Sequence, residues 1–511
     1  MKTAILSAFI GAALCTPQGP DYSRMTSSGR AKATCEILRF TNRAATSFPN
    51  ETAYDLDNND YYSMASSLGP ACVYAPSSNR DLSAAVLLLR ATRAPFAVRS
   101  GGHMPVEGAN GIGSDGVLLS MTNFTQLSLS QDKTSVRIGA STIWNQVYKL
   151  LEPEGLVVVG GRIGLPGVPG LVLGGGISFL GQQYGWAANN VLSFTCVLSD
   201  GRIVAASARQ NPDLFWALKG GGNSFALVTE LELRTYPSAT VSVGQVEYGT
   251  GPDVRSKWIS AIVHFAHNGP SDPRAAIIPN SGRNPRQPVE DYAAFRFLNG
   301  ADPAPKILEN FTAPFLPSVT NDTYRARSLY NWTLEIDPQL DAGLAGFRNR
   351  YTGLSIPADE RALDITLQTF FQVLDESPIP SFPYYIASII PMPMTKAYFQ
   401  AAVDRGGDPM GLTPDDAPFL WVEMSETYTL PEQDAIVTKF VKDVDARIRG
   451  ALKEAGFKEN KYVYLNSADK WQDVFGGYKR ENVDRLRRIR RRYDPEGLFT
   501  TQMRGGFKVG L

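Results

Sequence analysis

The chain has no excess of charge of either sign, because 50 lysines and arginines balance 50 aspartates and glutamates among its 511 residues. Without net charge, a protein lacks the attraction that draws basic proteins to nucleic acids and anionic membranes, so we expect neither as a partner. The arginine-rich segment 485–495 is accordingly interpreted as the solvated face of a helix. No stretch is apolar over enough residues to form a transmembrane helix, so no membrane span is predicted.

Histidine is also scarce, with three copies in the chain. His264 and His267 lie one helical turn apart, but no third metal-ligating residue is near them in the sequence, so no metal site is predicted. His103 follows a glycine pair in RSGGH, and glycine lets a backbone approach a ligand closely. His103 is therefore either a turn residue or a group directed at a ligand of this loop.

The N-terminal segment MKTAILSAFIGAALC has one lysine followed by an apolar run. This pattern predicts a secretory signal peptide cleaved near Cys15, and the polar residues that follow make a buried strand the weaker alternative. Five glycosylation sequons lie downstream, so we expect a glycoprotein that is secreted or in the secretory pathway. The sequons begin at Asn50, Asn123, Asn310, Asn321 and Asn331.

Three cysteines remain after the predicted cleavage, and an oxidising compartment permits one disulfide. We predict a bridge between Cys35 and Cys72. Cys196 lies in the apolar strand LSFTCVL and is expected to be a buried thiol. A bridge that involves Cys196 is the alternative.

The chain is long enough for two or three domains, and its pattern changes near Pro237. Before that point short strands and helices alternate from Cys72 onward, which indicates a mixed domain. Residues 240–455 instead carry longer amphipathic helices, with isolated strands predicted at 365–374 and 419–428. We interpret this part as an antiparallel sheet with helices on one face.

Of four glycine-rich stretches, the first two expose backbone N–H groups that suit a diphosphate, and the number of such stretches favours a large nucleotide cofactor. Arg99 and Lys219 are candidates to add positive charge there. A formal GxGxxG at 111–116 is rejected as a nicotinamide site, because no strand enters it and a strand rather than a helix leaves it. The four stretches are 100–103, 164–176, 219–225 and 504–508.

PFAVRSGGH, followed in order by DGVLLSM, VRIGA, GLVLGGG and ALKGGGNSF, closely resembles the flavin-binding half of berberine-bridge-enzyme-like oxidases. These belong to the vanillyl-alcohol-oxidase / p-cresol-methylhydroxylase superfamily. In the tail, YLNSAD, YDPEGLF and GGFK resemble the C-terminal elements of the family. The resemblance spans roughly residues 70–237 and 460–508.

The resemblance implies an α+β fold, with a two-part FAD-binding domain of the p-cresol-methylhydroxylase type and an inserted substrate domain in which helices cover an antiparallel sheet. The boundaries that we predict are a signal peptide at 1–15, an N-terminal segment at 16–67, the FAD-binding domain at 68–239, the substrate-binding domain at 240–455 and a C-terminal segment at 456–511 that completes the FAD domain.

The resemblance also implies FAD bound covalently through His103, because the histidine of RSGGH bonds to the flavin in such proteins. Many members have a second bond, to a cysteine at the position of Ile163, so one bond is expected here. The cofactor contacts implied by these loops are Arg99, Ser100, Gly101, Gly102, His103, Gly170, Gly174, Gly175 and Val228.

Enzymes of this kind take a hydride from a carbon atom while a base removes a proton, and then pass electrons to dioxygen. The candidates for the base or for substrate contacts are Glu423, and Tyr464 and Asn466, which alternate onto one face of a strand predicted at 461–466. Ser467 replaces a tyrosine that is common in the family, so the family's usual acid–base arrangement is not carried over intact.

We expect a secondary-metabolite or aromatic, alkaloid-like alcohol or amine as substrate, with coupled cyclisation as a related outcome. A carbohydrate oxidase is the alternative within the same class, and a flavin-binding glycoprotein without turnover is the alternative of another class. The oligomeric state is left open.

Overall fold

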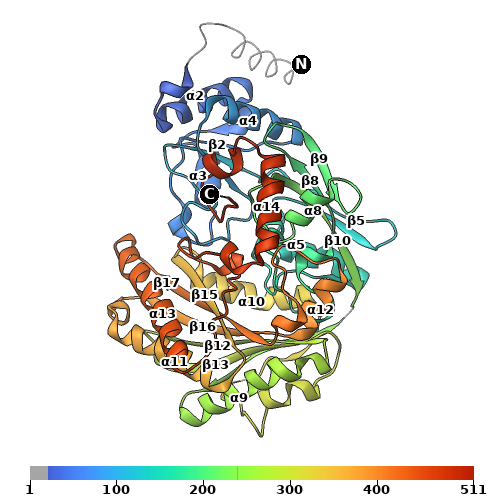
Figure 1. Ribbon diagram of the computed structural model, residues 1–511, viewed down its shortest axis with the longest axis vertical. Coiled ribbons are helices and arrows are strands. Elements are labelled where there is room, and N and C mark those ends of the chain that lie inside the picture. The colour runs from blue at the N-terminus through green and yellow to red at the C-terminus, as the bar shows by residue number, and fades with distance from the viewer. Residues whose placement is uncertain (1–20, 239, 321, 511) are drawn as a thin grey trace.

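The computed structural model describes residues 21–510 apart from 239 and 321, so the predicted signal peptide and the sequon at Asn321 lie outside the described residues. Figure 1 shows two halves, with the strands up to residue 237 in the upper half and a larger sheet in the lower half. No helix within the described ranges is both long enough and apolar enough to cross a membrane.

The first sheet has four strands in the order β1-β2-β4-β3, and β4 is parallel to both β2 and β3. Helix α4 connects β2 to β3, and the hydroxyl of Ser78 caps it by accepting a hydrogen bond from the Asp81 N–H. Strand β3 ends at Arg99, so the RSGGH loop starts at its carboxyl end. The bounds are β1 (Thr46–Ser47), β2 (Cys72–Tyr74), α4 (Asn79–Thr92), β3 (Phe96–Arg99) and β4 (Val117–Ser120).

The second sheet is antiparallel, in the order β5-β6-β10-β8-β9, and β7 pairs with the far end of β10. Asp200 and Gly201 form the turn between β8 and β9, where Gly201 has a φ of 81°. The strands are β5 (Leu127–Leu129), β6 (Ser135–Gly139), β7 (Leu156–Val158), β8 (Val191–Val197), β9 (Ile203–Ser207) and β10 (Leu227–Pro237). The helices are α5 (Trp144–Leu151), α6 (Val168–Leu173), α7 (Gly181–Tyr184) and α8 (Pro212–Ala217).

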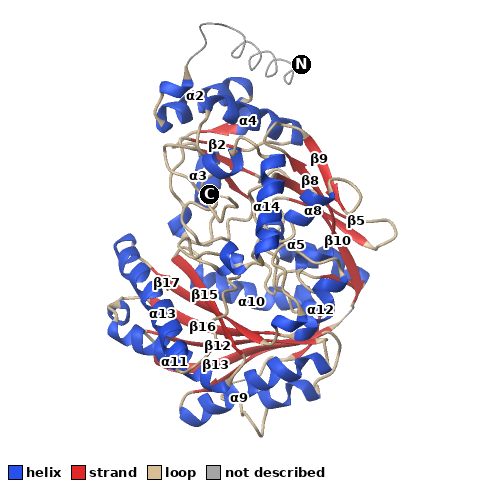
Figure 2. Cartoon of the chain, viewed as in Figure 1, coloured by secondary structure: helices blue, strands red, loops and turns tan. Residues whose placement is uncertain are grey.

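The third sheet has seven antiparallel strands in the order β14-β11-β13-β12-β16-β17-β15. Helices pack on one face of this sheet (Figure 2), and their apolar residues share a core with it. The strands are β11 (Val241–Gly249), β12 (Ala275–Asn284), β13 (Gln287–Leu298), β14 (Arg325–Arg327), β15 (Arg348–Pro357), β16 (Tyr385–Met394) and β17 (Phe419–Tyr428). The covering helices are α9 (Pro252–Asn268), α11 (Glu360–Glu376) and α13 (Asp434–Glu454), and two others are α10 (Leu329–Leu344) and α12 (Lys396–Asp404).

The tail returns to the first half of the chain. Helix α14 (Arg480–Tyr493) lies against α8, and its arginine-rich part is exposed as expected. The Tyr478 hydroxyl donates to the Gly220 carbonyl at 2.8 Å, and the Val509 N–H donates to the Ser224 hydroxyl at 3.0 Å. The two-part fold implied by the resemblance is therefore confirmed.

Two predicted strands are absent. Residues 365–374 belong to α11, because Leu363, Leu367, Phe370 and Leu374 recur at helical spacing on a buried face and Asp359 caps the helix. The aromatic and β-branched composition of the segment alone had suggested a strand. Residues 461–464 are extended without a ladder partner, and a 3₁₀ turn follows at Leu465–Ser467.

The predicted disulfide is confirmed: Cys35 in α2 (Ser27–Thr41) is bonded to Cys72 at the start of β2, and Cys196 is a buried free thiol. A further helix, α3 (Thr52–Asn59), lies between these two elements in the sequence. The bridge ties the N-terminal helix to the first sheet.

We expect that serine at both Cys35 and Cys72 lowers the free energy of unfolding by about 2–4 kcal/mol. The physical reason is that the bridge spans a sequence separation of 37 residues and restricts the unfolded chain. Urea unfolding followed by tryptophan fluorescence measures the loss, and wild-type protein with reductant should lose the same amount. A double variant as stable as the oxidised wild type would contradict this.

Candidate active site

A cavity of about 580 Å³ lies between the glycine loops of the first half and the seven-stranded sheet. This volume is in the usual range for small-molecule and cofactor sites. Most of the residues predicted from the sequence meet here. Those that line the cavity are Ser100, Gly101, Gly102, His103, Gly170, Gly174, Val228, Glu423, Tyr464 and Asn466.

Arg99 and Gly175 do not line the cavity. The Arg99 side chain is buried, and its guanidinium pairs with Asp57 at 2.5 Å and with Asp60 at 2.7 Å. Arg99 therefore ties β3 to the N-terminal segment. Lys219 likewise donates to a protein group, the Gly407 carbonyl, at 2.7 Å.

The glycine loops approach each other too closely for side chains. A Cβ at Gly101 would lie 2.6 Å from the Gly167 Cα, and Gly102 has a φ of 62°. At Gly170 a Cβ would meet nothing within 4 Å, so this backbone borders open space. Backbone groups thus line one part of the cavity and side chains of the sheet line another. These residues fit an FAD, because the exposed backbone N–H groups of the glycine loops would hold its diphosphate.

His103 lines the cavity with its side chain half-buried, and its ring stacks on Tyr62 with 4.1 Å between ring centroids. Burial lowers the pKa of the imidazole to about 4, so the ring is neutral at pH 7 and keeps a nucleophilic lone pair. The Tyr62 hydroxyl accepts a hydrogen bond from the Tyr351 hydroxyl at 2.7 Å. Position 163, where many members of the family have the second attachment cysteine, also lines the cavity. It is an isoleucine here and offers no thiol.

Tyr464 is held by two donors. Its hydroxyl oxygen accepts from the Ile177 N–H at 2.9 Å and from the Asn466 amide at 3.0 Å, and the same amide donates to the Leu171 carbonyl at 2.8 Å. Within the described residues the hydroxyl hydrogen of Tyr464 has no acceptor, so it is available to a ligand, and the Asn466 amide holds this hydroxyl in place. The two side chains meet across the 3₁₀ turn and not by strand alternation.

Glu423 is a buried carboxyl on β17 that accepts a hydrogen bond from the Ser467 hydroxyl. Burial raises the pKa of Glu423, while the positive charge of Arg162 and the Ser467 bond pull it down. Ser467, the departure from the family pattern, therefore contacts the candidate base directly.

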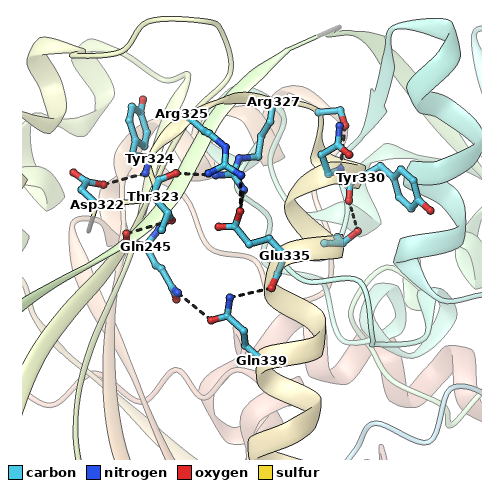
Figure 3. Close-up of polar contacts among 12 residues, drawn as sticks. Gln245, Asp322, Thr323, Tyr324, Arg325, Arg327, Tyr330, Glu335 and Gln339 are labelled. Carbon is cyan, nitrogen blue, oxygen red and sulfur yellow. Dashed lines mark hydrogen bonds and ion pairs between the residues drawn. The ribbon is translucent and has the colours of Figure 1, made fainter. Parts of the chain in front are cut away.

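Helix α10 forms a side wall of the cavity and is held to β11 and β14 by polar contacts (Figure 3). The Gln245 amide donates to Gln339 at 3.0 Å, and the Gln339 amide donates to the Glu335 carbonyl at 3.0 Å. Arg325 and Arg327 each contact the Glu335 carboxylate at 2.7 Å. The residues of α10 that line the cavity are Gln339, Leu340, Gly343 and Leu344.

Sequence reasoning missed Tyr62, Tyr351 and Arg162 as cavity residues. Tyr62 precedes the recognisable motifs and Tyr351 lies in the generic middle of the chain, so neither has a local signal. Arg162 ends the GGR segment at 160–162, which belongs to the motifs that resemble the family's flavin-binding half, but the motif assigns no role to the arginine.

Gly174 has a steric role in this site. A Cβ there would lie 2.1 Å from the Asn466 Oδ1 and 2.7 Å from the Nδ2, so alanine displaces the amide that holds Tyr464. We expect Gly174→Ala to lower kcat per bound flavin about 10- to 100-fold. Steady-state kinetics and flavin absorbance test this. Gly450→Ala, whose Cβ meets nothing within 4 Å, is the matched control, and equal kcat in the two variants would refute the role.

Comparisons with known proteins agree with this geometry. The family model described as FAD binding domain matches residues 70–207, and the model described as berberine and berberine like matches residues 463–503. The FAD-dependent monooxygenase prx3 of Penicillium roqueforti is 32% identical over 519 residues, covering 99% of this chain and 98% of the relative.

Two solved structures share the fold at low sequence identity. The xylooligosaccharide oxidase of Myceliophthora thermophila C1 is 20% identical, with a TM-score of 0.74 over 93% of this chain and 99% of that one. The berberine bridge enzyme of Eschscholzia californica is 16% identical, with a TM-score of 0.74 over 94% of this chain and 100% of that one. The full-length relative, the two matched domains and the shared fold together establish that the chain belongs to the berberine-bridge-enzyme-like family of FAD-linked oxidoreductases.

Proposed function

We propose that this FAD-dependent oxidoreductase oxidises a small secondary-metabolite or aromatic alcohol or amine and passes the electrons to dioxygen, with FAD bonded to His103. When bound, FAD supplies the acceptor for the hydride. The observation that carries the proposal is that the buried Glu423 carboxyl and the Tyr464 hydroxyl line the same cavity as His103.

In this proposal, Glu423 accepts the proton from the substrate O–H or N–H. A general base works best when its pKa lies near the working pH, and burial moves the pKa of Glu423 upward in that direction. Burial also raises the pKa of Tyr464, which moves the phenol away from neutral pH. We therefore assign Tyr464 to orienting the substrate and Asn466 to holding Tyr464.

The side chains around this cavity support an aromatic substrate over an oligosaccharide. Sheet residues such as Ile278, Phe295, Ile386 and Ile390 present apolar surface to the cavity. An oligosaccharide carries many hydroxyl groups, and burying them without hydrogen-bond partners is costly.

A second candidate function is monooxygenation, favoured by the name of the 32% identical relative. Anaerobic mixing of the purified protein with a panel of aromatic alcohols and amines tests turnover. In an enzyme the substrate reduces the flavin and bleaches its absorbance, whereas in a flavin-binding protein without turnover the absorption spectrum only shifts. Readmitted ¹⁸O₂ then separates the two reactions. One hydrogen peroxide per product without label indicates an oxidase, and labelled product indicates a monooxygenase. A flavin that no compound bleaches would refute the oxidase, and a flavin that a reduced nicotinamide also fails to bleach would refute the monooxygenase.

We further propose that the protein enters the secretory pathway and is glycosylated. The Cys35–Cys72 bridge and the exposed positions of Asn50, Asn123 and Asn331 support this. Treatment of protein from the native host with an N-glycosidase tests it, and an unchanged mass on treatment would contradict it.

A further inference from the structure

The inference concerns Arg162 and rests on the proposed function, since it assigns the substrate class of the same cavity. Among the described residues that line the cavity, Arg162 is the only arginine or lysine and Glu423 is the only aspartate or glutamate. A cation on a largely apolar wall is costly unless it has a task or a partner.

Arg162 has no ion-pair partner among the residues that the structure describes. Its guanidinium donates from Nη1 to the Met392 sulfur, a weak acceptor, and within the described chain Nε and Nη2 make no bond. Nε and Nη2 are adjacent on one edge of the guanidinium. That edge matches the two coplanar oxygens of a carboxylate.

The backbone around Arg162 is fixed from two sides. The Arg162 carbonyl accepts from the Trp332 indole at 2.9 Å, and a Cβ at Gly161 would lie 2.6 Å from Trp144. The side chain therefore starts from a rigid position, which lowers the entropy cost of binding a ligand.

The charge of Arg162 acts where the substrate is proposed to react. It pulls down the pKa of Glu423, Tyr351 and Tyr464 against the burial that raises each of them. All three side chains line the cavity, so the guanidinium charge acts on groups that face the cavity.

We propose that Arg162 binds a carboxylate of the substrate side-on through Nε and Nη2, so that the enzyme selects aromatic alcohols or amines that carry a carboxylate.

The test is calorimetric titration of the holoprotein at pH 7 with benzoate and with benzamide, which has the same shape but no charge. We expect Arg162→Met to weaken benzoate binding about 10- to 100-fold, as for loss of a charge-assisted bidentate contact, with benzamide binding nearly unchanged. Arg162→Lys should weaken benzoate binding less than Arg162→Met does. The exposed Arg209→Met is the matched control and should bind both compounds as the wild type does.

Equal binding of benzoate and benzamide by the wild type, or unchanged benzoate binding by Arg162→Met, would overturn the inference. A shift of the flavin reduction potential in Arg162→Met without loss of benzoate binding would also overturn it and assign the charge to the cofactor. This test can be distinguished from the test of the proposed function. If benzoate binding depends on Arg162 but no substrate bleaches the flavin, the proposed reaction is refuted and the carboxylate site is supported.

Discussion

Replacing His103 by alanine is expected to abolish covalent attachment of the flavin completely. The physical reason is that burial holds the imidazole neutral, with a pKa of about 4, and that Ile163 offers no thiol at the family's second attachment position. Flavin fluorescence of the protein band on a denaturing gel measures attachment, and peptide mass spectrometry locates the bond.

The matched control is His264→Ala, because this histidine is exposed on α9. Its band should keep the full fluorescence. A fluorescent His103→Ala band, or a flavin-bearing peptide that lacks residue 103, would refute the assignment. Because the glycine loops contribute backbone groups, the variant is still expected to bind FAD without the bond, and dialysis should then remove it.

The sequence predicted those parts of the site that depend on local motifs. The RSGGH and GLVLGGG segments line the cavity because their glycines permit close backbone approach, and this need is visible in the residue types themselves. The pairing of Cys35 with Cys72 followed from the apolar surroundings of Cys196. Local pattern failed at 365–374, where composition suggested a strand and the apolar spacing was helical.

Contacts between distant segments were not predictable in this way. The sequence predicted that Arg99 contacts the cofactor, but its guanidinium forms ion pairs with Asp57 and Asp60 of the N-terminal segment. Nothing local places Tyr62 on the ring of His103, or Ser467 on Glu423. These pairings depend on how the two halves and the tail pack, which no single-sequence pattern encodes.

Glu423→Gln is expected to lower kcat about 10²- to 10⁴-fold, because the amide keeps the size of the side chain but cannot accept a proton. Flavin content should not change. Tyr464→Phe should lower kcat only about 10-fold, which corresponds to the loss of one orienting hydrogen bond. Stopped-flow reduction of the flavin by substrate measures both. The opposite order, with a large loss in Tyr464→Phe and little in Glu423→Gln, would transfer the role of base to Tyr464.

The pH dependence of flavin reduction distinguishes a base from a merely structural carboxyl. A base must be ionised, so the rate should rise with pH through the raised pKa of Glu423, and this rise should vanish in Glu423→Gln. The Ser467 hydroxyl donates to the carboxylate and thereby lowers this pKa, so Ser467→Ala should move the rise to higher pH while the plateau rate is nearly kept. An unmoved pH profile in Ser467→Ala would mean that Glu423 does not titrate in the reacting complex. Proton transfer to Glu423 predicts two results together: the pH-dependent rise in the reduction rate is lost in Glu423→Gln and moves to higher pH in Ser467→Ala. A change in packing would instead alter the plateau rate.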